Sequence, residues 1–145
     1  QKNLFARSVC VLTPTDKTNP AALRRVVSFW RFLGAKTMVL NPQEHDKSLC
    51  FASHLPHLIA FSLVNAIPTP YFKLGAGGLK DTTRIAASDH ILWSDIFLAN
   101  RSNILKAISV FEKRLKELKT AIKNKNDKLL KKLILESRKK REALK

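Results

Sequence analysis

The chain has 145 residues, of which 45% are hydrophobic and 26% charged, so it suits one domain with a real core, or one helical domain carrying a fragment of a neighbour. This composition argues against a disordered chain and against two complete domains. The formal net charge of +16 is concentrated in residues 113–145, which hold fourteen Lys and Arg against four Asp and Glu. We interpret this basic tail as a solvated helix face, because Lys outnumbers Arg and no aromatic residue follows Phe111. Attraction of nucleic acid or of an anionic membrane surface is the alternative.

The first elements predict a strand, a helix and a second strand. Residues 8–12 form a short apolar run ended by a proline turn, and Asn19-Pro20 is typical of a helix start. Apolar residues then recur at helical spacing up to Gly34, where a left-handed cap is expected. Residues 37–40 predict the second strand. One βαβ crossover cannot bury both of its strands alone, so we expect the last piece of a larger α/β domain.

The next segments predict helices joined by a glycine-rich connection. Residues 44–67 read as mostly helical, with Ser53 as a cap and Pro56 in a first turn. Residues 68–78 hold two prolines and three of the four glycines, which predicts a connection with at most a short helical piece. Ser88 or Asp89 is expected to cap a helix that runs toward Phe111 or beyond.

The strongest periodic signal lies near the carboxyl end. Apolar residues spaced alternately by four and three form a coiled-coil-like seam, and two leucines continue it after a polar break at Lys125-Asn126. The seam comprises Ile104, Ile108, Phe111, Leu115, Leu118 and Ile122, then Leu129 and Leu133. Packing inside one chain is an alternative, but so few helices cover little of a long seam. We therefore expect burial against a second subunit.

Cysteine usage and hydropathy bear on the cellular setting. Cys10 and Cys50 are 40 residues apart without a CxxC motif, so we expect two buried small side chains rather than a disulfide framework or a metal site. No signal peptide opens the chain, and the longest apolar stretch, Leu58–Ile67, is too short to span a bilayer. We expect a soluble cytoplasmic protein with no membrane partner.

Two clusters carry the chemistry. Ser53-His54-Leu55-Pro56-His57 places two imidazoles on adjoining positions of a helix, which suits hydrogen bonding to an anionic or hydroxylated ligand, with two partly exposed structural histidines as the alternative. The few other histidines and acids lie at no recognised metal-ligand spacing, so no metal is expected.

The second cluster, residues 75–86, combines glycines with Lys80, Asp81 and Arg84. Arg84 is a candidate carboxylate clamp, held in place by Asp81, with Trp93 as a pocket wall. A surface ion pair is the alternative. A dinucleotide-binding loop is not indicated, because position 80 is Lys and no convincing strand precedes the glycines.

Taken together and in order, these motifs resemble the prephenate dehydrogenase family over residues 8 to 122. The resemblance rests on Ser53-His54-Leu55-Pro56-His57 and Gly77-Gly78-Leu79-Lys80-Asp81-Thr82-Thr83-Arg84-Ile85-Ala86, flanked by Leu12-Thr13-Pro14-Thr15, Phe29-Trp30 with Leu33-Gly34-Ala35, Glu44-His45-Asp46, and Trp93 with Asn100. Members of the family oxidise prephenate with NAD, in some cases NADP, to 4-hydroxyphenylpyruvate and carbon dioxide on the way to tyrosine.

The resemblance implies a mainly α fold: a helical dimerisation domain with a long carboxyl-terminal helix, preceded by a residual βαβ unit of a Rossmann-like domain. Residues 1–43 would be the end of the nucleotide-binding domain, and residues 44–145 the dimerisation and substrate-binding domain with its basic tail. A homodimer is expected. The implied substrate-binding residues are Arg84, His57, Ser53, His54, Lys80, Asp81, Gly77 and Trp93.

The family's catalytic histidine, its supporting serine and its glycine-rich nucleotide loop are expected upstream of this sequence. No catalytic or cofactor-binding residue is therefore assigned here, and we expect this chain alone not to turn over prephenate. Prephenate is the expected ligand, with L-tyrosine as a possible second ligand. The alternatives are an arogenate or cyclohexadienyl dehydrogenase, and a tyrosine-binding regulatory dimerisation module. Nucleic acid is not expected as a partner.

Overall fold

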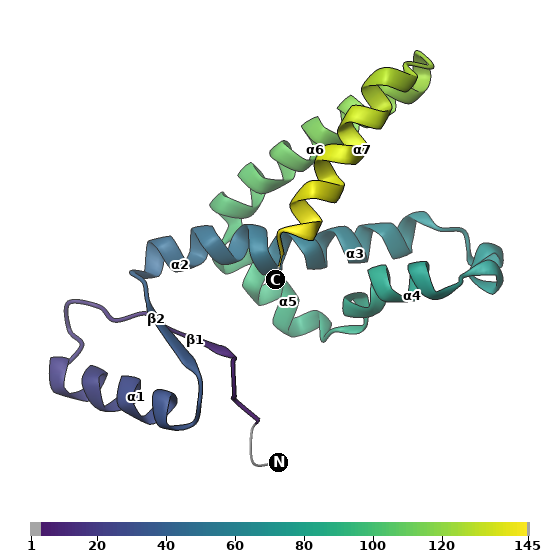
Figure 1. The fold of residues 1–145 in the computed structure, drawn as a ribbon. Helices are drawn as coiled ribbons and strands as arrows, with labels where there is room; N and C mark the ends of the chain where they lie inside the picture. The colour runs from purple at the N-terminus through teal and green to yellow at the C-terminus, as the bar shows by residue number, and fades with distance from the viewer. Residues whose placement is uncertain (1–3, 145) are drawn as a thin grey trace. The chain divides into compact units, whose positions relative to one another are not determined.

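The computed structural model describes residues 4–144, which form two compact units, one reaching to Asn103 and the other starting at Ile104. The first unit contains a two-stranded parallel sheet and a series of helices. The second contains most of one long helix and the helix that follows it (Figure 1). The protein is therefore mainly helical with a small β unit, as the sequence predicts.

The amino-terminal elements form the predicted βαβ crossover. Strand β1 (Val9–Leu12) leads through helix α1 (Pro20–Phe32) to strand β2 (Lys36–Val39), and the strands pair in parallel. The Asn19 side chain accepts hydrogen bonds from two backbone N–H groups of the first turn, and Pro20 occupies a position where its missing N–H costs nothing. The predicted start of this helix is confirmed.

Gly34 ends α1 in the predicted left-handed conformation. Its φ is +85°, and the N–H of Ala35 donates to the Trp30 carbonyl, which satisfies a carbonyl of the last turn. A Cβ at this position would also lie 3.4 Å from the Ala6 backbone. Glycine is therefore required here for both φ and space.

The β unit lacks cover of its own. Helix α1 has no fully buried residue among those described, and Phe32 is 87% exposed. Both strands also carry exposed apolar side chains, among them Val9, Met38 and Val39. A parallel pair normally has both faces covered, whereas apolar side chains of both strands stay exposed here.

Residues 42–66 form one continuous helical run made of helix α2 (Pro42–Leu49), a π-helical turn η1 (Cys50–His54) and helix α3 (Leu55–Ala66). The N–H of Leu55 donates to the Cys50 carbonyl five residues back. This wider turn lets Pro56 continue the helix, because it relieves the clash of the ring with the preceding turn. The prediction that Ser53 caps a new helix was wrong, since the backbone does not break there and no side-chain cap bond forms.

The continuous helix Pro42–Ala66 also changes the prediction about membrane-spanning length. By length and composition alone, Pro42–Ala66 is long and apolar enough to cross a membrane, and 17% of its most apolar window is buried within the described chain. The expectation that no segment reaches this length was wrong, because the π turn joins the polar helix α2 and the apolar helix α3 into one continuous helix.

The glycine-rich connection is more helical than predicted. A 3-10 segment η2 (Thr69–Leu74), helix α4 (Gly77–Thr83) and a 3-10 segment η3 (Arg84–Ala87) follow one another in short steps. Both α4 and η3 pack against α3. The connection thus folds back along α3, the helix that carries His57 (Figure 1).

Helix α5 (His90–Ala99) begins at the predicted cap, where the Asp89 carboxylate accepts a hydrogen bond from the Leu92 N–H. The predicted continuation to Phe111 is interrupted at Asn100, which ends α5, and helix α6 (Arg101–Lys123) starts directly after it. The apolar periodicity continues across this break, so the sequence pattern did not reveal it.

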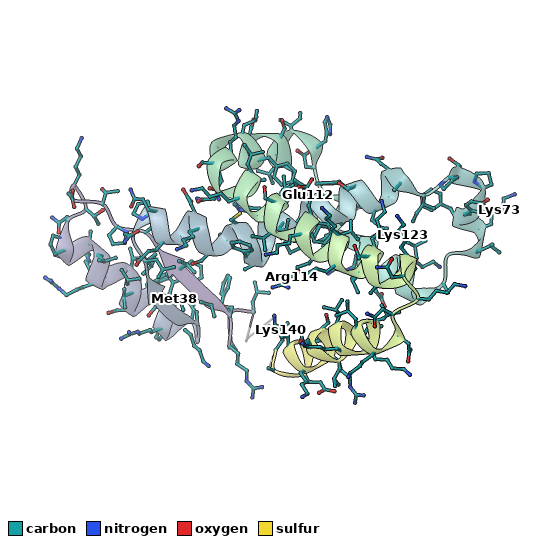
Figure 2. The ribbon with its side chains drawn as sticks, turned by 90° about the horizontal axis from the view of Figure 1, so that it is seen from above. Met38, Lys73, Glu112, Arg114, Lys123 and Lys140 are labelled. Atoms are coloured by element: carbon teal, nitrogen blue, oxygen red, sulfur yellow. The ribbon has the colours of Figure 1, made fainter. Side chains whose placement is uncertain are left out.

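Helix α7 (Asp127–Glu142) follows α6 after a tight turn at the predicted polar break. Lys125 has a φ of 49°, and the Asn126 side chain caps α7 by accepting from the Leu129 N–H. Arg114 and Lys123 lie on α6 and Lys140 on α7 (Figure 2). The long carboxyl-terminal helix of the prediction is thus a helical hairpin.

The predicted seam is divided by this hairpin. Leu118 and Leu133 line the same hollow between α6 and α7, so the chain itself covers part of the seam. Leu115 and Ile122 remain 53% and 62% exposed. Packing within one chain, the alternative to a second subunit, therefore accounts for one part of the apolar surface and leaves another part open.

Candidate functional site

Trp93 is the centre of an aromatic cluster. Its side chain comes from α5, is 8% exposed, and meets rings from η1 and α3. The partners are His54, His57 and Phe61, together with Phe97 one turn further along α5. The predicted neighbourhood of the two histidines and the tryptophan is therefore present, and it lies within one compact unit.

His57 is held in one orientation by two contacts. Its ring stacks on Trp93 with centroids 3.6 Å apart and planes inclined by 20°. Its Nδ1 lies 2.9 Å from the Ser53 carbonyl oxygen, which can only accept, so Nδ1 carries a proton. The Nε2 atom of the neutral ring is then a hydrogen-bond acceptor. Ser53 contributes through its backbone, one helical turn earlier.

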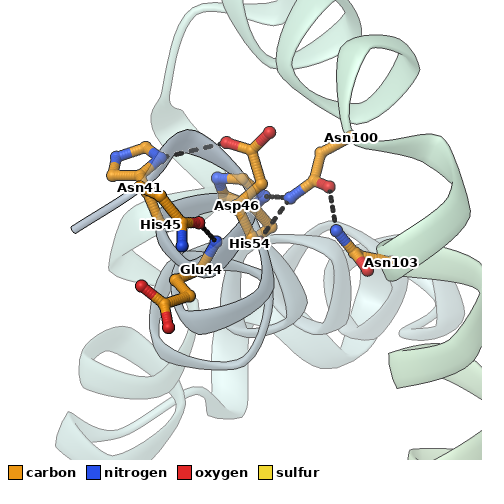
Figure 3. Close-up of polar contacts among 7 residues, drawn as sticks. All are labelled: Asn41, Glu44, His45, Asp46, His54, Asn100 and Asn103. Carbon is orange, nitrogen blue, oxygen red and sulfur yellow. Dashed lines mark hydrogen bonds and ion pairs between the residues drawn. The ribbon is translucent and has the colours of Figure 1, made fainter. Parts of the chain in front are cut away.

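His54 is buried and is fixed by Asn100 (Figure 3). The Asn100 amide nitrogen lies 2.7 Å from the Asp46 carbonyl oxygen and 3.2 Å from His54 Nδ1, while the Asn100 oxygen accepts from Asn103 at 2.8 Å. Because a carbonyl oxygen requires a donor, the first contact identifies the NH₂ end of the amide. The same NH₂ group then donates to His54 Nδ1, which carries no proton.

The surroundings of His54 oppose its charged form. Burial lowers the pKa of His54 below its ordinary value, and the neighbouring His45 and His57 act in the same direction, whereas Asp46 opposes them. The Asp46 carboxylate itself is 3.0 Å from His45 Nδ1. His54 is therefore a neutral side chain at neutral pH.

Arg84 begins η3 and is exposed. Its segment packs against α3, the helix that carries His57, so the two predicted ligand-binding elements are in contact. No hydrogen bond or ion pair within residues 4–144 joins the Arg84 guanidinium to His57 or to Asp81. The geometry thus brings the segments together and leaves the guanidinium open for another partner.

The remaining predicted residues lie on α4. Lys80 and Asp81 are exposed there, and Gly77 is its first residue. A Cβ placed on Gly77 would meet no atom within 4 Å, so neither packing nor φ within this chain demands glycine at this position. An open backbone at this point suits close approach of another group.

Sequence reasoning missed the role of Asn100 and of two phenylalanines. Asn100 is a buried amide at the end of the apolar helix α5. It forms hydrogen bonds with the backbone of Asp46 and the side chain of His54, both of which are far away in the sequence. The sequence feature that could have indicated this role is a single amide side chain between two apolar helical patterns. Phe61 and Phe97 were indistinguishable from ordinary core residues until the fold placed them beside Trp93.

Neither a metal site nor a dinucleotide site is built from these residues. Within residues 4–144 there is no group of three or more His, Cys, Asp or Glu side chains placed to hold a metal ion. The connection from β1 to α1 contains no glycine, and the start of α1 is capped by Asn19. A pyrophosphate needs close backbone approach at such a turn, so this crossover does not fit a dinucleotide.

Comparison with known proteins gives one consistent family. The family described as "Prephenate dehydrogenase, dimerization domain" matches residues 41–136. Cyclohexadienyl dehydrogenase from Zymomonas mobilis is 35% identical over 98% of this chain, which covers 51% of that protein. Prephenate dehydrogenase from Bacillus subtilis is 32% identical over 82% of this chain, which covers 34% of that protein. The chain therefore spans about half or less of these relatives.

Solved structures agree with the sequence relatives. Prephenate dehydrogenase from Aquifex aeolicus, in complex with hydroxyphenyl propionate and NAD⁺, matches 99% of this chain with a TM-score of 0.89 and 40% identity, over 52% of its own length. Arogenate dehydrogenase from Synechocystis matches 97% of this chain with a TM-score of 0.82 and 27% identity, over 53% of its length.

Proposed function

The chain belongs to the prephenate dehydrogenase family, through its dimerization domain, and we propose that it supplies the subunit interface and the substrate-pocket wall of an NAD-dependent prephenate dehydrogenase of tyrosine biosynthesis. The observation that carries the proposal is the aromatic and histidine cluster around Trp93, which joins the Ser53–His57 motif to α5, while the segment of Arg84 packs against α3. The reaction converts prephenate and NAD⁺ to 4-hydroxyphenylpyruvate, carbon dioxide and NADH.

The proposed roles follow from the charges of prephenate. This substrate has two carboxylates, so a site must offer fixed cations and donors to orient it. Arg84 binds one carboxylate with its planar guanidinium. His57, with Ser53 and His54, lines the pocket, and Trp93 forms its wall. Lys80 and Asp81 set the charge at its mouth, and Gly77 leaves room for the ligand.

The cofactor and the catalytic groups are proposed to come from another part of the enzyme. NAD, or NADP as the alternative, supplies the hydride acceptor when bound. The described crossover from β1 to α1 does not fit a dinucleotide, so no catalytic step is assigned to this chain. Its contribution is to bind and orient the substrate and to exclude water from it.

A second copy of the chain is proposed as the partner that covers the apolar surface. The long run Pro42–Ala66 carries His54 and His57, which bond to Asn100 and to the Ser53 carbonyl. Polar groups of this kind are costly in the hydrocarbon of a membrane, whereas a subunit interface accommodates them. We therefore favour a cytoplasmic homodimer over a membrane-bound protein.

Two other functions stay open. The similarity to cyclohexadienyl and arogenate dehydrogenases favours a related substrate in which an amino group replaces the side-chain keto group of prephenate. A regulatory module that dimerises and binds L-tyrosine is the other alternative. The two differ from the main proposal in the ligand that binds most tightly.

Calorimetric titration of this chain with prephenate, arogenate and L-tyrosine separates these proposals. The main proposal expects prephenate to bind most tightly and Arg84→Ala to weaken it by roughly 10- to 100-fold, as for loss of a hydrogen-bonded charge pair of about 1.5–3 kcal/mol. Arg25→Ala is the matched control: it removes an exposed arginine of α1, away from the Arg84 segment in sequence, and should leave binding unchanged. Preference for arogenate or L-tyrosine would replace the main proposal with the corresponding alternative.

A further inference from the structure

His54 and His57 lie three residues apart, yet their hydrogen bonds place the ring proton on opposite nitrogens. His57 donates from Nδ1 to the Ser53 carbonyl, whereas His54 accepts at Nδ1 from the Asn100 amide. In its neutral form His54 therefore carries its proton on Nε2. One short motif thus presents two imidazoles of opposite hydrogen-bonding character.

We propose that Asn100 is a positioning residue that holds His54 as the Nε2–H tautomer, so that this nitrogen donates a hydrogen bond to an anionic oxygen of the ligand. The inference deepens the proposed function and rests on it for the identity of the ligand. The tautomer itself rests only on the contacts of Asn100.

Two contacts fix the orientation of the Asn100 amide. The Asp46 carbonyl oxygen at 2.7 Å demands the NH₂ end, and the Asn103 amide donates to the oxygen end at 2.8 Å. Rotating the amide by half a turn would set oxygen against oxygen at Asp46 and NH₂ against NH₂ at Asn103. The donor directed at His54 Nδ1 is therefore determined by neighbours other than His54 (Figure 3).

The Nε2 atom of His54 is free to serve a ligand. It has no hydrogen-bond partner in the part of the chain that the structure describes. No fully buried side-chain nitrogen or oxygen of these residues lacks a partner. The Nε2 atom must therefore keep access to the surface, although the residue as a whole is 8% exposed. A buried ring with one accessible N–H is a fixed donor.

Nitrogen NMR of the imidazoles tests the tautomer without any ligand. Long-range proton–nitrogen correlation of the ¹⁵N-labelled chain at neutral pH should show His54 with an unprotonated Nδ1 and a protonated Nε2, and His57 with a protonated Nδ1. The His54→Gln spectrum assigns the His54 signals. A protonated Nδ1 on His54, or nitrogens averaged between both tautomers, would overturn the proposal.

Two variants test the role of Asn100. Asn100→Asp replaces the donor by an acceptor, so His54 should become protonated on both nitrogens at neutral pH, with Asp46 adding to this effect and His45 and His57 opposing it. Asn100→Ala should give averaged His54 nitrogens. Asn124→Asp makes the same charge change at an exposed position and should leave the His54 signals unchanged. If His54 in folded Asn100→Ala keeps the wild-type tautomer, Asn100 does not position it.

The NMR result for the His54 tautomer and the result of prephenate titration can fail independently of each other. The predicted tautomer without prephenate binding would reject the ligand assignment and keep the role of Asn100. Prephenate binding with the other tautomer would do the reverse. If either substitution prevents folding, the wild-type tautomer still decides the inference.

Discussion

Replacing Trp93 by alanine should destabilise the helical part of the chain more than any other single aromatic substitution. The side chain is 8% exposed and meets four rings, including the His57 imidazole at 3.6 Å. Truncating a buried aromatic residue costs about 3–5 kcal/mol, through lost burial and the cavity left behind. Because domains are stable by only about 5–15 kcal/mol, this is a large fraction of the total.

Urea unfolding followed by far-ultraviolet circular dichroism measures the effect. With a slope of about 2 kcal/mol per molar urea, the midpoint of Trp93→Ala should fall by roughly 1.5–2.5 M. All samples need one protein concentration, because the stability of a dimer depends on it. Trp93→Phe keeps a six-membered ring in place and should lose clearly less.

Trp30→Ala is the matched control. Trp30 is partly exposed in the β unit and meets Phe5 and Phe29, so its removal should cost less than that of Trp93. The stacking has its own signature, since the ring protons of His57 should shift downfield when the indole is removed. A loss below about 1 kcal/mol for Trp93→Ala, or unmoved His57 protons, would refute the reasoning.

Three further predictions concern pH, thiol reactivity and activity. Because the folded state lowers the pKa of His54 below the unfolded value of about 6.5, the unfolded state binds the proton more tightly. The contribution of His54 to stability should be full above about pH 6.5 and should decline as the pH falls through that value toward the folded pKa. The difference in unfolding free energy between the wild type and His54→Gln measures this contribution. A difference that does not vary with pH would contradict the prediction. Cys50 is fully buried and burial raises the pKa of its thiol, so an aromatic disulfide reagent should modify Cys10 much faster than Cys50 until urea is added; equal rates would contradict the burial. This chain alone should not oxidise prephenate with NAD, because its described β1–α1 crossover does not fit a dinucleotide. Activity above a no-enzyme control would contradict this prediction.

The sequence predicted those elements whose signals are local. Asn19-Pro20, Gly34 and Asp89 mark helix ends by capping chemistry that depends on a few neighbouring residues, and each lies where expected. The parallel crossover follows from the order of strand, helix and strand. These features need no knowledge of distant contacts.

Elements that depend on distant contacts were missed. The Ser53 cap failed because a π turn carries the helix through Pro56, and nothing local to the serine reveals that turn. The break at Asn100 is stabilised by Asp46 and His54, which are remote in the chain. Apolar spacing alone could not separate one long helix from two.

The candidate site was predicted in part. The neighbourhood of His54, His57 and Trp93 emerged from the family motifs, and the structure adds the contacts that fix each ring. The roles assigned to Arg84, Lys80 and Asp81 stay predictions, because their side chains are exposed and await a ligand.

Exposed apolar side chains on α5, α6 and α7 lead to the central claim, which is that two copies of this chain assemble into the unit that binds substrate. Light scattering coupled to size exclusion measures the mass of the chain in solution directly. Twice the mass of one chain is expected at micromolar concentration. A mass of one chain under the same conditions, with native circular dichroism, would contradict it.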